Sequence, residues 1–450
     1  MSLAVVILAA GQGTRMNSKI PKVLHPVAGK PMVSYSVDVA QALGAHRFVL
    51  VVGHRSEQIR TVVGATAEFV EQIEQKGTGH AVLQAREALR GQSETVMVLY
   101  GDMPLLRTET LQRLYDRQQA TNACITMLTV MADDPMGFGR IVRESDGSVV
   151  KIIEESEATP AQLAIKELNC GIYCFNADWL WEHLLRLRPA PKKQEYFLTD
   201  LVQMAANEQA LIETETLRDR SEVIGINTRV HLAEAEAIMR NRIRERAMLS
   251  GVTLTDPDKT YIDAEVEIGQ DTVILPGTHL WGKTKIGSDC HIGPDAQVRD
   301  SVIGDRCEIG ASLLEQSMLQ DEVKVGPYCH LRPGTVLGVG VHLGDHAELK
   351  NARLGPGTKM GHFSYLGDAE VGARVNIGAG TITCNYDGKH KQRTVIGDDA
   401  FIGSDTMLVA PVSVGARART GAGSVVTRDL PPDSLSVGVP ARVIKQLEIT

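Results

Sequence analysis

A glycine loop directly after an apolar run is the first feature of this sequence that could do chemistry. It reads Gly11-Gln-Gly-Thr-Arg-Met16 and is followed by Pro21-Lys22. Glycines let backbone amides approach phosphate oxygens closely. Arg15 and Lys22 can stabilise the charge that develops when a nucleoside triphosphate is attacked at its α-phosphorus, so both are candidate catalytic residues. Met16 at the sixth position excludes a dinucleotide fingerprint, and the lack of a following Gly-Lys-Ser/Thr excludes a P-loop.

Two oxygen-bearing side chains in the same half are candidate magnesium ligands. Asp102 follows the apolar run Thr95–Tyr100, and Asn227 precedes a long helical segment. Few protein ligands are expected, because Mg²⁺ retains waters and binds substrate phosphates. Taken alone, Asp102 could equally be a turn residue and Asn227 a helix N-cap.

A second polar cluster interrupts the C-terminal half, around His362 and Tyr365. A histidine can take the proton of an attacking amine. Arg332 and Lys350 can hold a sugar phosphate, and backbone or hydroxyl donors can stabilise a tetrahedral oxyanion. These residue types suit acetyl transfer to an amine. A lone histidine in a repeat is more often a turn residue, so the hypothesis depends on these neighbours.

The elements that position the first group follow an α/β pattern up to about residue 227. The expected buried strands are apolar runs, namely Leu3–Ala9, Arg47–Val52, Thr95–Tyr100 and Ala123–Val130. The expected helices lie between them, over Met32–Gly44, Gly77–Arg90 and Thr108–Ala120. This alternation predicts a mostly parallel sheet with helices on both faces. Gly11 and Asp102 then fall at carboxyl ends of strands, where such sheets place their sites.

From about Ile262 the sequence changes to a six-residue repeat. Ile286-Gly-Ser-Asp-Cys-His291 and Ile303-Gly-Asp-Arg-Cys-Glu308 illustrate it. Such repeats predict a parallel β-helix of about nine or ten coils, with the aliphatic residue pointing inward. Cys290, Cys307 and Cys329 occupy the fifth repeat position, which predicts a packing role. The stretch Thr383–Thr394 breaks the period and is expected to leave the coil as a loop.

These patterns predict three parts: a nucleotidyltransferase domain over residues 1–227, a linker helix over 228–250 and a β-helix domain over 251–450. The net charge of −8 argues against nucleic-acid binding but allows small anionic substrates. No apolar stretch is long enough to span a membrane. The seven scattered cysteines lack zinc-ribbon spacing and indicate a reducing compartment, so a cytoplasmic location is expected.

The pattern from Leu8 through Gly11-x-Gly-Thr-x-Met16 to Pro21-Lys22 resembles the nucleotidyltransferases that activate sugar phosphates. The resemblance implies that Asp102 and Asn227 hold magnesium. It also implies binding of UTP and the UDP-sugar by a larger set, namely Leu8, Ala9, Ala10, Gly11, Lys22, Gln72, Gly77, Thr78, Tyr100, Gly101, Asp102, Gly139, Glu154, Asn169 and Asn227.

With both halves considered, nearly the whole chain resembles the bacterial bifunctional N-acetylglucosamine-1-phosphate uridyltransferase/glucosamine-1-phosphate acetyltransferase family. The most specific segments are the glycine loop, Gly361–Gly367 and Asn376–Gly388. The family implies a left-handed β-helix, a homotrimer, and UTP and acetyl-coenzyme A as cosubstrates. Its product, UDP-N-acetylglucosamine, is a precursor of peptidoglycan and lipopolysaccharide.

The resemblance also implies roles in the second half. His362 is the implied general base, with Arg332, Lys350, Tyr365 and Asn376 as ligands of glucosamine-1-phosphate. Acetyl-coenzyme A is implied at a further group, Asn385, Tyr386, Ser404 and Ala422, of which Asn385 is also a candidate sugar-phosphate ligand.

One departure concerns the C-terminus, where many relatives place an arginine that meets coenzyme A. That position is Gly438 here, and Arg442 or Lys445 are the candidate substitutes. Two other readings remain. A single-headed sugar-1-phosphate nucleotidyltransferase would use the β-helix only for assembly or regulation, which leaves the His362–Asn385 cluster without a purpose. A non-catalytic scaffold would not need Arg15, Lys22, Asp102 and Asn227.

Overall fold

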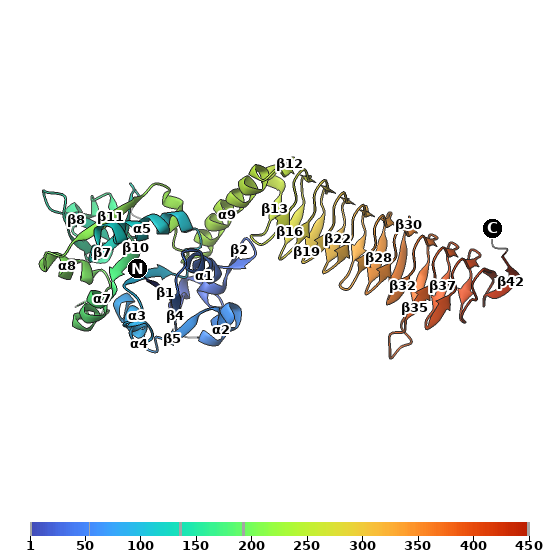
Figure 1. Cartoon of the computed structure of the whole chain (residues 1–450), viewed down its shortest axis with the longest axis horizontal. Helices are drawn as coiled ribbons and strands as arrows, with labels where there is room; N and C mark the ends of the chain where they lie inside the picture. The colour runs from blue at the N-terminus through green and yellow to red at the C-terminus, as the bar shows by residue number, and fades with distance from the viewer. Residues whose placement is uncertain (1, 54, 135–136, 191–193, 448–450) are drawn as a thin grey trace. The chain divides into compact units, whose positions relative to one another are not determined.

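The computed structural model describes residues 2–53, 55–134, 137–190 and 194–447 of the 450-residue chain (Figure 1). Contacts divide the chain into two compact units, Met1–Met239 and Arg240–Thr450. The division falls inside the helix α9, Arg229–Leu249. None of the described helices has the length and apolar content that a bilayer span requires.

The first unit is built on one mixed sheet. Its main strands run in the order β11-β7-β10-β6-β1-β4-β5. Their bounds are β1 Leu3–Ala9, β4 Arg47–Val52, β5 Glu68–Glu71, β6 Thr95–Tyr100, β7 Ile125–Met131, β10 Glu167–Asn176 and β11 Ile212–Leu217. The bounds of β1, β4 and β6 are those predicted. β1 pairs in parallel with both β4 and β6, whereas β10 pairs antiparallel with β6 and β7.

Two hairpins complete the strands of this unit: β2 Pro26–Val27 with β3 Lys30–Pro31, and β8 Arg140–Arg143 with β9 Val149–Ile153. The remaining helices of the unit are α1 Met32–Ala42, α2 Ser56–Val63, α3 Thr78–Gln84, α4 Arg86–Leu89, α5 Thr108–Thr121, α6 Pro160–Leu163, α7 Ala177–His183 and α8 Asp200–Asn207. The segment predicted to be helical over Gly77–Arg90 comprises two helices, α3 and α4. It breaks at Ala85, whose backbone joins α3 to α4.

Helices cover both faces of the sheet, as predicted. Leu3, Val5 and Ile7 of β1 pack in one core cluster with residues of α1, α2 and α5. Ala4, Val6 and Leu8 pack on the opposite face with residues of α3, α7 and α8. Because both faces are buried, the strand reads as a continuous apolar run, which is why its bounds could be predicted.

The second unit is a parallel β-helix with three walls (Figure 1). The first wall comprises β12 Thr253–Leu254, β15 Val273–Ile274, β18 His291–Ile292, β21 Glu308–Ile309, β24 Lys324–Val325, β27 His342–Leu343, β30 Lys359–Met360, β33 Asn376–Ile377, β36 Phe401–Ile402, β39 Arg419–Thr420, β41 Ser434–Val437 and the antiparallel β42 Arg442–Gln446.

The second wall comprises β13 Tyr261–Ile262, β16 His279–Trp281, β19 Gln297–Arg299, β22 Leu313–Glu315, β25 His330–Leu331, β28 Ala347–Lys350, β31 Ser364–Gly367, β34 Ile382–Cys384, β37 Met407–Val409 and β40 Val425–Val426. The third comprises β14 Glu267–Ile268, β17 Lys285–Ile286, β20 Val302–Ile303, β23 Met318–Leu319, β26 Val336–Leu337, β29 Arg353–Leu354, β32 Ala369–Val371, β35 Thr394–Ile396 and β38 Val412–Val414. The second wall has ten strands and the third has nine, which agrees with the predicted nine or ten coils.

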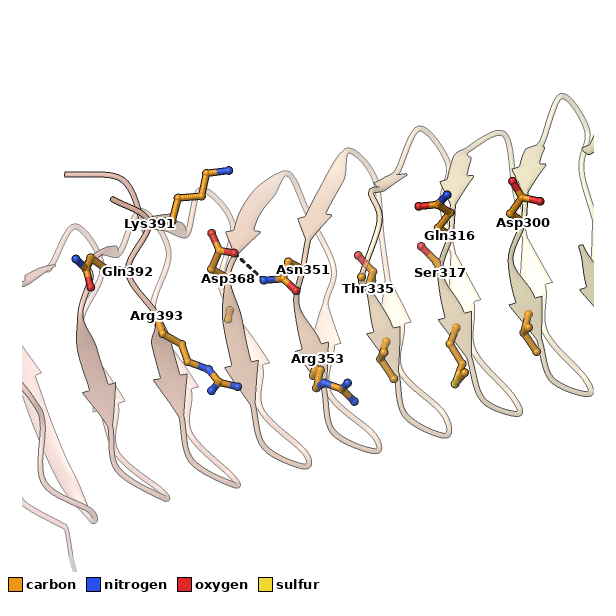
Figure 2. A pocket seen from close by; sticks show the side chains of 15 residues that line it. Asp300, Gln316, Ser317, Thr335, Asn351, Arg353, Asp368, Lys391, Gln392 and Arg393 are labelled. Atoms are coloured by element: carbon orange, nitrogen blue, oxygen red, sulfur yellow. Dashed lines mark hydrogen bonds between the residues drawn. The ribbon is translucent and has the colours of Figure 1, made fainter. Parts of the chain in front are cut away.

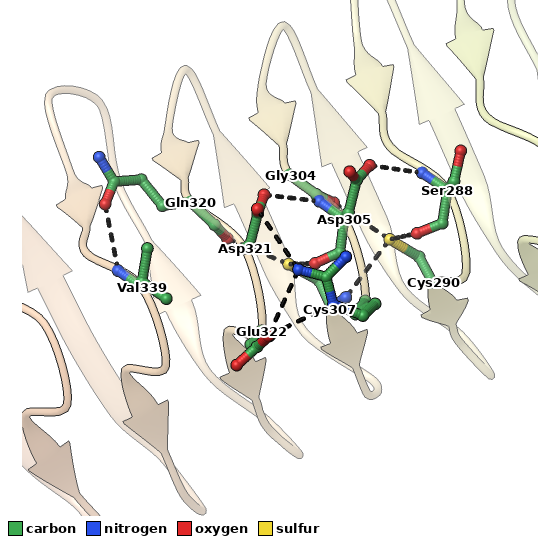
Figure 3. A network of polar contacts seen from close by, with 10 residues as sticks. Ser288, Cys290, Gly304, Asp305, Cys307, Gln320, Asp321, Glu322 and Val339 are labelled. Carbon is green, nitrogen blue, oxygen red and sulfur yellow. Dashed lines mark hydrogen bonds and ion pairs between the residues drawn. The ribbon is translucent and has the colours of Figure 1, made fainter.

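The three cysteines at fifth repeat positions are buried packing residues, as predicted. The Sγ of Cys290 donates to the carbonyl oxygen of Gly304 at 3.1 Å, and that of Cys307 to Gln320 at 3.2 Å. Carboxylates cross-link the same corner, where Asp305 accepts from the Ser288 amide at 2.8 Å (Figure 3). Coil-to-coil hydrogen bonds therefore fix the turns as well as the strands.

The chain leaves the coil between β34 and β35 (Figure 1). The predicted loop is therefore present, but it is confined to residues 385–393, because Thr383, Cys384 and Thr394 belong to the flanking strands. Its tip is a tight turn with a single bridge between Tyr386 and Lys391. The carboxylate of Asp387 accepts from the amides of Lys389 at 2.8 Å and His390 at 2.7 Å. The loop is therefore ordered by its own hydrogen bonds.

Candidate active sites

A cavity of about 350 Å³ opens in the first unit, at the carboxyl ends of β1, β5 and β6. We call it the nucleotide cavity. Its lining includes many predicted residues, namely Leu8, Ala9, Ala10, Gly11, Lys22, Gln72, Gly77, Thr78, Tyr100 and Asp102. They converge because parallel strands deliver their following loops to one edge of the sheet.

Lys22 is the centre of a polar cluster at this cavity. Its Nζ lies 2.5 Å from Oδ2 of Asp102 and 3.0 Å from Oδ1 of Asn227. The same Asn227 oxygen accepts from the guanidinium of Arg15 at 3.2 Å. Thr228, rather than Asn227, accepts from an amide of the first turn of α9, that of His231. The side chain of Asn227 is thus turned to the cations instead of capping the helix.

The oxygens of Asp102 and Asn227 fit a hard divalent cation. Both converge on one positively charged atom, Lys22 Nζ, so a single ion could contact the two oxygens together. The described residues contain no group of three or more His, Cys, Asp or Glu side chains arranged for a metal. A magnesium ion bound here would complete its shell with waters and phosphate oxygens.

Three residues of the implied UDP-sugar set, Gly139, Glu154 and Asn169, are absent from the lining of the nucleotide cavity. Burial, with the negative charges of Asp102 and Glu154, raises the pKa of Tyr100. The side-chain oxygen of Asn169 accepts from the hydroxyl of Tyr173 at 2.9 Å, and the backbone amide of Asn169 donates to the carbonyl of Gly139 at 2.9 Å. Glu154 accepts from Thr199 at 2.9 Å. A hydrogen-bonded group is therefore present next to the cavity.

Sequence reasoning missed several residues of this region. The cavity lining also contains Val23, Gln75, Ala81, Glu195 and Phe197. Gln75 donates to the carbonyl of Ala10 at 2.5 Å and so ties the loop after β5 to the loop after β1. No motif marks these residues, and Glu195 and Phe197 come from a segment more than 100 residues beyond the glycine loop. Gly101 is buried behind the cavity, with its amide donating to Leu8 at 2.9 Å.

The predicted residues of the β-helix are spread over two corners and two walls. His362, Ser404 and Ala422 are exposed and lie in the turns that follow strands of the first wall. Asn376 lies on the first wall itself, in register with Lys359 and Phe401.

The cations lie at the next corner, after strands of the second wall. Arg332 follows β25 and Lys350 ends β28. The Lys391 ammonium, from the protruding loop, lowers the pKa of Lys350. Arg332 pairs with Glu348 at 3.2 Å. Three cations, with the carboxylates of Glu348 and Asp368 beside them, form a surface that can bind a phosphate.

Asn385 and Tyr365 meet near this second corner. A Cβ on Gly367 would lie 2.6 Å from Nδ2 of Asn385, and the hydroxyl of Tyr365 lies over the same glycine. Asn385 is buried and donates to Asp368 at 2.6 Å, while Tyr386 is 62% exposed. The Tyr365 hydroxyl and Asn385 thus lie where the strands of the second wall end. His362 lies in the turn before β31, where these strands begin.

A groove of about 700 Å³ runs along the second corner and third wall, and it contains none of the predicted residues (Figure 2). It lies between the coil turns and the loop residues Lys391 and Arg393, with Asn351 donating to Asp368 at 2.8 Å.

At the C-terminus, Gly438 stands at the position where many relatives of the resembled family place a coenzyme A arginine, and it has a left-handed φ of 100°. Arg442, a candidate substitute for that arginine, pairs with Val437 across the two last strands.

Known proteins match both units. Residues 5–152 match the model of the MobA-like NTP transferase domain. Residues 265–300, 283–312 and 393–428 match the bacterial transferase hexapeptide model of six repeats. The bifunctional protein GlmU of Trichlorobacter lovleyi is 48% identical over 98% of this chain and 97% of its own length. Those of a Geobacillus species and of Geotalea uraniireducens are each 47% identical, over 98% and 99% of this chain and 96% and 98% of their own lengths.

Proposed function

The chain belongs to the bifunctional GlmU family, and from this membership we propose how its two units divide the work. The protein is an enzyme of UDP-N-acetylglucosamine synthesis with two activities. The β-helix acetylates glucosamine-1-phosphate with acetyl-coenzyme A. The first unit then transfers UMP from UTP to N-acetylglucosamine-1-phosphate. The observation that carries this assignment is the convergence of Lys22, Asp102 and Asn227 on one edge of the nucleotide cavity.

Uridylyl transfer needs no covalent enzyme intermediate. A phosphate oxygen of N-acetylglucosamine-1-phosphate attacks the α-phosphorus of UTP, and the bond to the β-phosphate oxygen breaks, so pyrophosphate leaves. Lys22 and Arg15 lie where the phosphates enter and stabilise the charge on the leaving group. Gln72, Gly77 and Thr78 hold the uracil, while Gly101, Gly139, Glu154 and Asn169 hold the sugar nucleotide beside Tyr100.

Magnesium is the cofactor that fits this edge, with Asp102 and Asn227 as its protein ligands. A magnesium ion held there would neutralise phosphate charge. Lys22 already holds both oxygens in place, so the ligands are oriented before substrate arrives. Asp102→Asn should remove nearly all uridylyl transfer and leave acetyl transfer intact. Near-normal uridylyl transfer by this variant at saturating magnesium would rule out the role.

Acetyl transfer uses the exposed His362 as general base. The amine nitrogen attacks the thioester carbonyl carbon, His362 takes the amine proton, and the carbon–sulfur bond breaks to release coenzyme A, which takes up a proton. Arg332 and Lys350 hold the sugar phosphate, with Tyr365 and Asn376 as further ligands. Asn385, Tyr386, Ser404 and Ala422 surround acetyl-coenzyme A.

A homotrimer would complete this second site. On one chain His362 and Asn385 belong to different corners of the prism, separated by the second wall. Convex walls do not enclose a ligand, so a neighbouring prism has to supply the other side of the pocket. We assign the protruding loop, with Asn385 and Tyr386, to the His362 of a second copy.

The enzyme is assigned to the cytoplasm. All seven cysteines are unpaired, which fits a reducing compartment. The direct test of the two activities supplies glucosamine-1-phosphate, acetyl-coenzyme A, UTP and magnesium to the purified protein. UDP-N-acetylglucosamine is expected as the product. If no UDP-N-acetylglucosamine forms and pyrophosphate is released only when N-acetylglucosamine-1-phosphate is supplied, the protein lacks acetyl transfer. It would then be a single-headed nucleotidyltransferase.

A further inference from the structure

Gln72 lines the nucleotide cavity, and two contacts fix which end of its side-chain amide can meet a ligand. Its Nε2 donates to the carbonyl oxygen of Gly77 at 3.0 Å and lies 3.1 Å from Nδ1 of His80. An amide nitrogen carries two hydrogens. The Gly77 carbonyl accepts one of them, and His80 Nδ1 accepts the other when that ring nitrogen is unprotonated. The free end is therefore Oε1, which can only accept a hydrogen bond.

The carbonyl of Gly77 keeps its orientation toward Gln72, because backbone hydrogen bonds to Tyr196 hold the loop that contains Gly77. The Tyr196 amide donates to Lys76 at 2.8 Å, and its carbonyl accepts from Gly79 at 2.8 Å. A Cβ on Gly77 would lie 2.7 Å from the Tyr196 oxygen, and Gly77 has a left-handed φ of 95°. Reversing the Gln72 amide would place two oxygens about 3 Å apart, which is unfavourable.

His80 contacts Gln72 from outside the nucleotide cavity. It lines a separate cavity of about 300 Å³, together with Lys76, Leu83 and Tyr196, and does not line the nucleotide cavity. To accept from Gln72, its Nδ1 has to be unprotonated. Burial first and the Lys76 ammonium second lower the pKa of His80, and the nearby Glu74 opposes them. The lowered pKa favours the neutral ring at neutral pH. Acceptance from Gln72 requires the tautomer in which Nε2, 3.2 Å from the Gln84 amide nitrogen, carries the hydrogen.

We propose that His80 is a positioning residue for base specificity, because it holds the Gln72 amide with only its oxygen facing the base. An acceptor at this point pairs with the N3–H of uracil or thymine and repels the unprotonated N3 of cytosine. A site built around such a hydrogen bond rejects a ligand that cannot make it, often by several orders of magnitude. The proposal rests on the proposed uridylyl transfer and names the group that makes it selective.

The test measures kcat/KM for UTP and for CTP in the full chain, with N-acetylglucosamine-1-phosphate as acceptor. His80→Phe keeps the ring but removes the acceptor. We expect the UTP-to-CTP ratio to fall about tenfold, mainly through KM for UTP, with kcat nearly unchanged. His80→Asn places an amide oxygen near the position of Nδ1 and should restore most of the ratio.

Two further variants separate positioning from general damage. Leu83→Ala removes packing from the same cavity but no partner of Gln72, so its ratio should equal that of the unmodified protein. In a Gln72→Ala background, His80→Phe should change the ratio no further. An unchanged ratio in His80→Phe, or an undiminished effect in the Gln72→Ala background, would overturn the proposal. If the unmodified protein transfers no uridylyl group at all, the proposed function itself fails. Acetyl transfer by the same samples reports whether each variant is folded.

Discussion

In the first unit, most of the residues expected to act on the nucleotide line one cavity or contact a residue that lines it. In the β-helix, the residues expected to act in acetyl transfer lie at two corners and on two walls of the prism. The difference follows from geometry. A parallel sheet brings several loops to one edge and forms a concave site within a single chain. The prism has flat walls and convex corners, and the groove on its second corner and third wall contains none of the predicted site residues. A site of the second kind needs another copy of the chain.

The largest expected effect breaks the β-helix site and leaves the sheet site alone. His362→Ala should lower acetylation of glucosamine-1-phosphate by about 10²–10⁴-fold, the usual cost of losing a general base. Uridylylation of N-acetylglucosamine-1-phosphate by the same protein should continue at its normal rate. Coenzyme A release and pyrophosphate release measure the two rates. A loss of acetylation below tenfold would mean that His362 is only a turn residue.

The converse variant breaks the sheet site. Lys22→Met removes the ammonium that contacts Asp102 and Asn227, and uridylyl transfer should fall by about 10²–10³-fold. Acetyl transfer should be unchanged. Lys30→Met is the matched control, because Lys30 pairs with Asp38 at 2.5 Å and does not line the nucleotide cavity. Equal losses in both lysine variants would indicate a general charge effect.

A smaller effect is expected where the sheet site depends on close backbone packing. Gly77→Ala introduces a Cβ against the Tyr196 backbone and strains a left-handed residue, so KM for UTP should rise about tenfold. Gly91→Ala is the control, since Gly91 also has a left-handed φ but its Cβ would meet nothing within 4 Å. If both variants raise KM equally, backbone strain rather than the contact is responsible.

The smallest effect concerns pH. The lowered pKa of His80 means that its ring gains a proton at a more acidic pH than an ordinary histidine does. Protonation places an N–H against the Gln72 nitrogen, so the UTP-to-CTP ratio should fall several-fold between about pH 7 and pH 5. Lys76, Glu74, Tyr196 and the Gln84 amide face the same ring. His80→Asn should have a pH-independent ratio. A ratio equally pH-dependent in both proteins would exclude His80 as the titrating group.

Much of the fold was predictable because the buried strands and the hexapeptide period are explicit in the sequence. The bounds of β10 were not predicted, since it mixes polar residues with apolar ones and contains Gly171, where its pairing with β7 shifts register. The end of α3 at Ala85 was also missed, because no glycine or proline marks it.

The site was predictable where a motif carries it. The glycine loop and Asp102 follow strands whose positions could be read, so their convergence could be expected. Tertiary packing alone brings Glu195 and Phe197 to the cavity and Tyr196 against its loop. No local sequence pattern predicts such packing. In the β-helix, the period fixes the coil position of each residue, but the distance between residues of neighbouring chains depends on assembly.

Complementation between inactive chains tests the shared acetyl-transfer site most directly. His362→Ala and Asn385→Ala should each be inactive in acetyl transfer when present alone. Trimers that contain both variants would include sites in which an intact His362 of one copy faces an intact Asn385 of another. We predict that purified mixed trimers, made by co-expression with two affinity tags, recover a fraction of acetyltransferase activity at normal uridylyl transfer. Complete inactivity of verified mixed trimers, or a monomer at working concentration, would contradict the account.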